Sequence, residues 1–315
     1  MLNKTVFLLI IIFLAFTNNA MALAEEQREG QPVYIGQFFD VPVPLGNYYF
    51  AKSALMVFGN RWGIQPRTGE ELEDIIWENL LLSFEAYRRN ISVTQDEIDA
   101  EVSAALKAEN VAFNWKKDTE AYTKWVKEKT NEPVEAFENQ IRYLLEIDKL
   151  RRQIVDSIEP QVQDKEAYQA FLDEENSIDL ELVLFEQEKY AQEFYARVKK
   201  EPKLWEEEKS KNPDGFKRPG FVTLIFLTDI WKIPKDELYK MMKMNPGDIY
   251  APVAIYQGYG VFKILAKKPA DDSGYAKVKY SYYDKVATRK KYEGLNEWIR
   301  RFKQQANIKI YKKGG

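Results

Sequence analysis

The stretch that decides the fold is MNPGDIYAPVAIYQGYGVFKILAKK, residues 244–268. Asn245-Pro246-Gly247 is typical of a turn. Two apolar runs follow, IYAPVAI and YGVFKILAKK, and Tyr256-Gln257-Gly258 joins them. A turn followed by two such runs predicts a pair of strands at the end of a small domain.

Residues 161–272 complete that domain. DKEAYQAFLDEE is predicted to be helical, IDLELVLF (178–185) a strand and EQEKYAQEFYARVKKEP a helix. NPDGFKRPG is interpreted as a loop, FVTLIFL (221–227) as a strand and PKDELYKMMKM as a short helix. The resulting order, β-α-β-α-β-β, predicts a small α+β domain.

The flanking regions are predicted to be helical. In residues 44–160, Thr68 with Glu71 and Thr94 with Glu97 have the spacing of capping boxes. Residues 273–315 begin with a helix whose apolar face contains Val286, Tyr292, Leu295, Ile299, Phe302 and Ala306. A lone helix cannot bury such a stripe, so we expect it to dock on the helical module.

The N-terminus has the three parts of a secretory signal peptide. Lys4 supplies the charge, residues 6–16 are an apolar run, and Ala22-Leu23-Ala24 is a small-x-small cleavage site. We therefore expect residues 1–24 to be removed on export, and residues 25–43 to form an extended arm. No later run reaches the roughly 18 apolar residues of a membrane span, so a soluble mature protein is predicted.

The composition excludes several kinds of site. The chain has no histidine and no cysteine, which rules out zinc sites built from these residues and histidine-based triads. We find no Gly-rich phosphate loop, so neither a nucleotide nor another cofactor is expected.

Charge is uneven along the chain. Residues 159–194 hold 11 acidic and 2 basic side chains, and residues 275–313 hold 12 basic and 3 acidic ones. The basic segment is compatible with nucleic acid or anionic lipid, but we favour a solvated helix face attracted to the acidic segment. No nucleic-acid partner is expected.

Four stretches in order carry a family resemblance: RRNISVTQDEIDAEV (88–102), FENQIRYLLEIDKLRRQIV (137–155), residues 244–265, and LNEWIRRFKQQANIKIY (295–311). Together they resemble the SurA/PrsA class of exported parvulin-type peptidyl-prolyl isomerases and chaperones. The resemblance implies an α+β protein in which a small parvulin-like domain is inserted between a helical module and the C-terminal helix that completes it.

The chain departs from the family at the positions that carry the chemistry. Active parvulins usually have two histidines, and the resemblance places these at Glu181 and Gly260. A third polar position falls near Asp214, whose alignment is loose. We interpret Glu181 as a strand carboxylate that faces solvent, with a replacement catalytic group as the alternative.

The apolar pocket of the family is only partly matched. Met242 and Ile249 correspond to residues that line the proline pocket, and Ala254 stands where that pocket often has an aromatic residue. The centre is therefore predicted to be degenerate, with no catalytic residue assigned.

By resemblance, the expected function is that of a periplasmic chaperone. It would bind unfolded or extended polypeptides passively, without ATP, and its clients would be outer-membrane proteins. Two alternatives stay open: an active isomerase with a non-standard centre, and a dedicated structural subunit of an envelope complex.

Overall fold

The computed structural model describes residues 33–311 and has an α+β fold. The predicted signal peptide and the first part of the predicted arm lie outside the described residues. The chain divides into two compact units, residues 1–159 with 291–315, and residues 160–290. Within residues 33–311, no helix is both long enough and apolar enough to cross a membrane.

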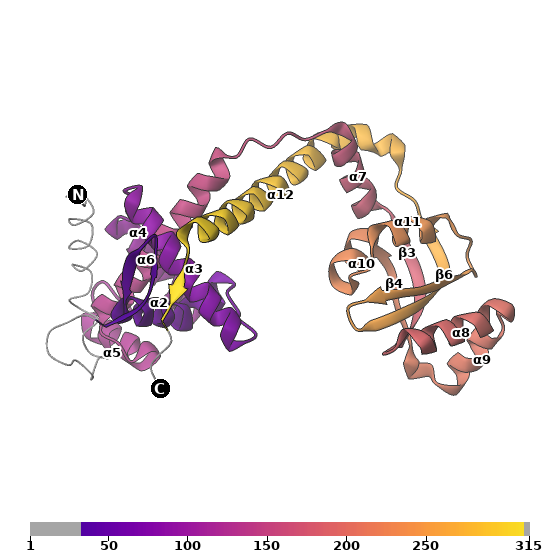
Figure 1. Ribbon diagram of the computed structural model, residues 1–315, viewed down its shortest axis with the longest axis horizontal. Helices are drawn as coiled ribbons and strands as arrows, with labels where there is room; N and C mark the ends of the chain where they lie inside the picture. The colour runs from indigo at the N-terminus through magenta and orange to yellow at the C-terminus, as the bar shows by residue number, and fades with distance from the viewer. Residues whose placement is uncertain (1–32, 312–315) are drawn as a thin grey trace. The chain divides into compact units, whose positions relative to one another are not determined.

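The first unit is built mainly from helices (Figure 1). They are α2 (Leu45–Phe58), η2 (Gly59–Trp62), α3 (Gly69–Arg88), α4 (Gln95–Ala108), α5 (Thr119–Thr130) and α6 (Val134–Ser157). The capping box of Thr94 and Glu97 is confirmed. At the start of α3 only half of the predicted box forms, because Glu71 accepts the N–H of Arg67 instead of that of Thr68.

A three-stranded sheet lies in the same unit. Its strands are β1 (Tyr34–Phe38), β2 (Val41–Pro44) and β7 (Lys309–Ile310), in the order β2-β1-β7. The described part of the predicted arm is thus a hairpin, to which the last strand of the chain is added.

The C-terminal helix α12 (Asp272–Ala306) completes the helical core. Leu295, Ile299, Phe302 and Ala306 are buried there, and the ring of Trp298 stacks on Phe302 at a centroid distance of 5.0 Å. The prediction was wrong for Tyr292, whose residue surface is 56% exposed. The apolar stripe is interrupted at the point where α12 passes from one unit to the other, and Val286 is buried in the second unit.

The second unit holds the inserted antiparallel sheet. Its elements are α7 (Asp164–Glu175), β3 (Ser177–Phe185), α8 (Glu188–Lys200), α9 (Leu204–Lys211), η3 (Pro213–Gly215), β4 (Phe216–Thr223), α10 (Leu224–Trp231), α11 (Lys235–Lys243), β5 (Ile249–Ile255) and β6 (Gly258–Lys268). The strand order is β4-β3-β6-β5. Helices α8 and α9 cover one face of the sheet, and α10 and α11 cover the other (Figure 1).

The middle of this unit differs from the prediction. The strand begins at Phe216, inside the predicted loop, and ends at Thr223, inside the predicted strand 221–227. The side chain of Thr223 accepts the N–H of Phe226 and so caps α10. Leu224 and Leu227, three residues apart, are then buried on the same side of that helix. A short apolar run is compatible with either a strand or a helix. Here the cap formed by Thr223 makes residues 224–231 a helix.

Ion pairs join α7 to the first half of α12. Lys279 pairs with Asp164 at 2.8 Å, Lys290 pairs with Glu166 at 2.7 Å, and Lys285 pairs with Glu174. The attraction expected between the basic and acidic segments is thus confirmed. A small buried cluster of Ala167, Phe171 and Tyr282 lies between the same helices.

The docking of α12 gives a direct test. Phe302→Ala removes a buried ring from the helical core and should lower the free energy of unfolding by about 3 kcal/mol. Tyr292→Ala, at an exposed position of the same helix, should change it by less than about 0.5 kcal/mol. Urea unfolding followed by tryptophan fluorescence measures both. Equal effects would mean that the end of α12 does not complete the core.

Candidate functional site

The two strands at the centre of the sheet place the candidate positions on opposite faces. Leu184 pairs with Gly260 and Leu182 with Phe262, and these pairs face α10 and α11. Glu181 pairs with Lys263 on the other face, toward α8 and α9. Because neighbouring residues of a strand point to opposite faces, Glu181 and a side chain at position 260 cannot form one polar centre.

The space beside Gly260 is filled by a phenylalanine ring. Gly260 is buried, and a Cβ placed on it would lie 2.7 Å from Cζ and 2.9 Å from Cε2 of Phe262. Phe262 is fully buried in the core of the sheet. The volume that a side chain at position 260 would need is thus occupied by Phe262.

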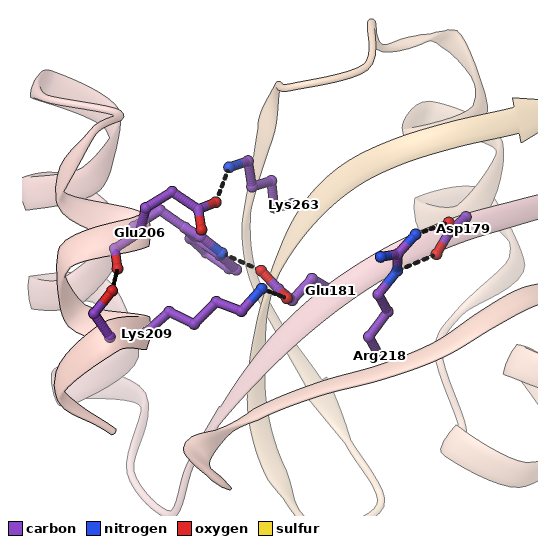
Figure 2. Close-up of polar contacts among 8 residues, drawn as sticks. Asp179, Glu181, Glu206, Lys209, Arg218 and Lys263 are labelled. Carbon is purple, nitrogen blue, oxygen red and sulfur yellow. Dashed lines mark hydrogen bonds and ion pairs between the residues drawn. The ribbon is translucent and has the colours of Figure 1, made fainter. Parts of the chain in front are cut away.

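The carboxylate of Glu181 is buried, which corrects the interpretation that it faces solvent. Its side chain is 4% exposed. Oε2 accepts the indole N–H of Trp205 at 2.6 Å and Oε1 accepts Nζ of Lys209 at 2.5 Å (Figure 2). This hydrogen bond to Glu181 raises the pKa of Lys209. Both oxygens have protein partners, so the carboxylate holds α9 against the sheet.

Asp179, two residues earlier on β3, is also buried and paired. Arg218 on β4 donates to Oδ1 of Asp179 from Nε at 3.2 Å, and to Oδ2 from Nη2 at 2.7 Å (Figure 2). Lys263 on β6 pairs with Glu206 on α9 at 2.7 Å. A buried carboxylate is costly unless it is paired and hydrogen-bonded, and both carboxylates of β3 meet that condition.

The structure does not bring the three pocket positions together. Met242 packs against the core beneath α10 and α11, whereas Ile249 packs against the cluster beneath α8 on the other face. Ala254 is exposed on β5. Asp214 is exposed in η3, before β4.

The sequence analysis did not identify the two residues that hydrogen-bond to the buried carboxylate of Glu181. Trp205 and Lys209 lie four residues apart in LWEEEKSK, and on a helix that spacing puts both side chains on one side. This spacing was an available signal that α9 presents a tryptophan and a cation to a buried acid. Within residues 33–311, no cluster of acidic residues has the arrangement of a metal site.

Comparison with known proteins finds similar solved structures. PrsA from Bacillus anthracis, described as a peptidylprolyl isomerase, is 21% identical over 76% of this chain and all of its own, with a TM-score of 0.44. A SurA-like chaperone of Campylobacter jejuni is 15% identical over 89% of this chain and all of its own, with a TM-score of 0.39. PrsA from Bacillus cereus is 15% identical over 90% and 96% of the two chains, also with a TM-score of 0.39.

These matches extend across most of the chain at low identity. They come from the class of proteins that the four sequence stretches resemble. No protein-family model matches this sequence, and neither does any curated protein.

Because Phe262 fills the space beside Gly260, we predict that adding a single methyl group at position 260 destabilises the protein. Gly260→Ala should destabilise the protein by about 2 kcal/mol, because the new Cβ collides with the buried ring of Phe262. Gly46→Ala is the matched control: it adds the same methyl group to α2, where nothing lies within 4 Å. That change should be neutral or stabilise by up to about 1 kcal/mol. Urea unfolding measures the free energy of unfolding of both variants. If Gly260→Ala left it unchanged, the space beside Gly260 would be free.

Proposed function

We propose that this chain is an exported chaperone that holds unfolded polypeptides without efficient prolyl isomerisation. It would be released from its signal peptide into the periplasm, and outer-membrane proteins would be its clients. No nucleotide is expected to drive the cycle, so clients would bind and leave passively through many weak contacts.

The loss of isomerase chemistry is supported above all by the contact of Phe262 with Gly260. Isomerisation requires the twisted amide, whose barrier is about 18–20 kcal/mol, to be bound better than the planar one. That takes an apolar slot and polar groups converging on it. Here Phe262 fills the space at position 260, and Glu181 is paired on the opposite face.

A role in binding is supported by large apolar side chains on the surface of both units. Met56 is 68% exposed in the helical unit, and Tyr256 is 69% exposed in the sheet unit. Neither contributes to a core. Methionine adapts to varied apolar partners, so Met56 is a candidate contact for a range of clients.

Two other functions remain distinct hypotheses. An active isomerase with a non-standard centre would have to use Glu181 in place of a histidine. A dedicated structural subunit of an envelope complex would bind one folded partner and not a range of unfolded chains.

A protease-coupled assay on proline peptides tests the isomerase alternative. We expect turnover at least 100-fold below that of an active parvulin, and no change in it with Glu181→Ala. Turnover equal to that of an active parvulin, and lost in Glu181→Ala, would establish the alternative. The fold of the variant is checked by circular dichroism, because the change leaves Lys209 without its partner.

Light scattering of a diluted, unfolded outer-membrane barrel protein tests the holding function. A several-fold molar excess of the chain should suppress the scattering, and ATP should make no difference. An absence of suppression at that excess would count against the holding function and favour the dedicated subunit. Albumin at the same concentration is the control for nonspecific protection.

A further inference from the structure

Residues 33–311 form two sheets, and three of their four edge strands contain proline. Pro42 and Pro44 lie in β2, Pro219 lies in β4 and Pro252 lies in β5. The prolines of β4 and β5 fall where the register of the ladder is irregular. Proline has no N–H, so on an edge strand it hinders the pairing of a further strand. Within the described residues, the edge strand without a proline is β7.

The prolines of β2 stand at the positions that face away from β1. The N–H of Leu45, the residue after β2, donates to the carbonyl oxygen of Val33 at 2.8 Å. Leu45 therefore faces β1. Because neighbouring residues of an antiparallel strand direct their backbone groups to opposite sides, Pro44 and Pro42 both face outward. The outer edge of β2 thus has no N–H at either position.

The same reasoning gives β7 a donor on its outer side. The N–H of Tyr311, the residue after β7, donates to the carbonyl oxygen of Ile35 at 2.8 Å, so Tyr311 faces β1. Its neighbour Ile310 therefore directs its own N–H and C=O away from β1. The sheet ends at β7, and Ile310 is 51% exposed. Unpaired backbone groups on an exposed edge are a template for another strand.

From this arrangement we infer that the outer edge of β7 binds an extended polypeptide segment, which joins the β2-β1-β7 sheet as a fourth strand. The N–H and C=O of Ile310 exchange hydrogen bonds with one residue of the added segment. Recognition falls on the backbone of that segment and not on its side chains. The inference rests on the proposed function, for which it names one contact surface and the chemical group that this surface recognises.

A second copy of this chain is disfavoured as the occupant of the same edge. Two-fold pairing of β7 with its copy would bring together the exposed Lys309 of both chains. Lysine on an edge strand acts against such self-pairing. We therefore expect a monomer in analytical ultracentrifugation. A dimer that Ile310→Pro dissociates would overturn the assignment of the edge to another polypeptide.

Fluorescence anisotropy with labelled, end-blocked peptides tests recognition of the backbone, using the chain without its predicted signal peptide. The first peptide alternates Thr and Val, the second has the same residues in scrambled order, and the third is the first with its central amides N-methylated. The first two should bind within about two-fold of each other, and the third at least ten-fold more weakly. Equal binding of the first and third, or no binding of the first, would overturn the inference.

Variants at one position separate the backbone from the side chain. Ile310→Pro removes the outward N–H and no donor to β1, so it should weaken binding of the first peptide about five-fold, the loss expected for one hydrogen bond. Ile310→Ala is the matched control, since it shortens the same side chain and keeps the N–H. It should bind within about two-fold of the unaltered chain. An equal loss in both variants would overturn recognition of the backbone.

Urea unfolding checks that Ile310→Pro leaves the fold intact. The midpoint should be unchanged in Ile310→Pro, because the lost N–H faces outward. Tyr311→Pro should lower it, because this variant loses the hydrogen bond to Ile35. The reverse pattern would mean that Ile310 faces β1, and the inference would fail.

The open edge and the holding function can fail separately. Suppression of scattering that persists together with peptide binding indifferent to Ile310→Pro would overturn the edge alone. Peptide binding that depends on the N–H of Ile310, without suppression of scattering, would overturn the holding function and leave the edge.

Discussion

The pairing of β3 with β6 is the constraint on which the sheet unit depends. Its register puts Leu180, Leu182 and Phe262 on one face, and Glu181 with Lys263 on the other. A shift of one residue would turn the charged set toward α10 and α11, and the apolar set toward the polar contacts of α9. The buried acids follow from this register, since each one meets a cation or an indole that α9 or β4 brings to its face.

The same register closes both faces of the sheet at the candidate positions. One face is closed by an aromatic ring beside a glycine, and the other is closed by paired charges. Each oxygen of Glu181 already accepts a hydrogen bond from the protein itself, and the carboxylate is buried. What remains open is the periphery, where rings such as Tyr190 and Tyr256 face outward.

Much of this architecture could be predicted from local sequence. The helices of the first unit follow from apolar spacing and from a cap such as Thr94, because these signals lie within one or two turns of the residues that they govern. The hairpin after Gly247 follows from its turn residues. To predict the α+β class and the docking of the last helix, only the order of these elements along the chain was needed.

The predictions were wrong or incomplete at positions whose structure depends on residues far away in the sequence. Glu181 looks like a surface acid in IDLELVLF, and only the approach of Trp205 and Lys209 from α9 makes its burial tolerable. The strand β1 is completed by Lys309 from the other end of the chain, which no local pattern reveals. Tyr292 fits the helical spacing of its neighbours, yet it lies where α12 leaves one core and has not entered the next.

The position of α12 also governs when the first unit can fold. Its core needs Leu295 and Phe302, and its sheet needs β7, all of which follow the inserted unit in the sequence. Until they are made, residues 33–159 lack the helix that completes their core and the strand that pairs with β1. Such a discontinuous unit closes its longest loop only after the inserted unit has been synthesised, so it should fold slowly and after that unit.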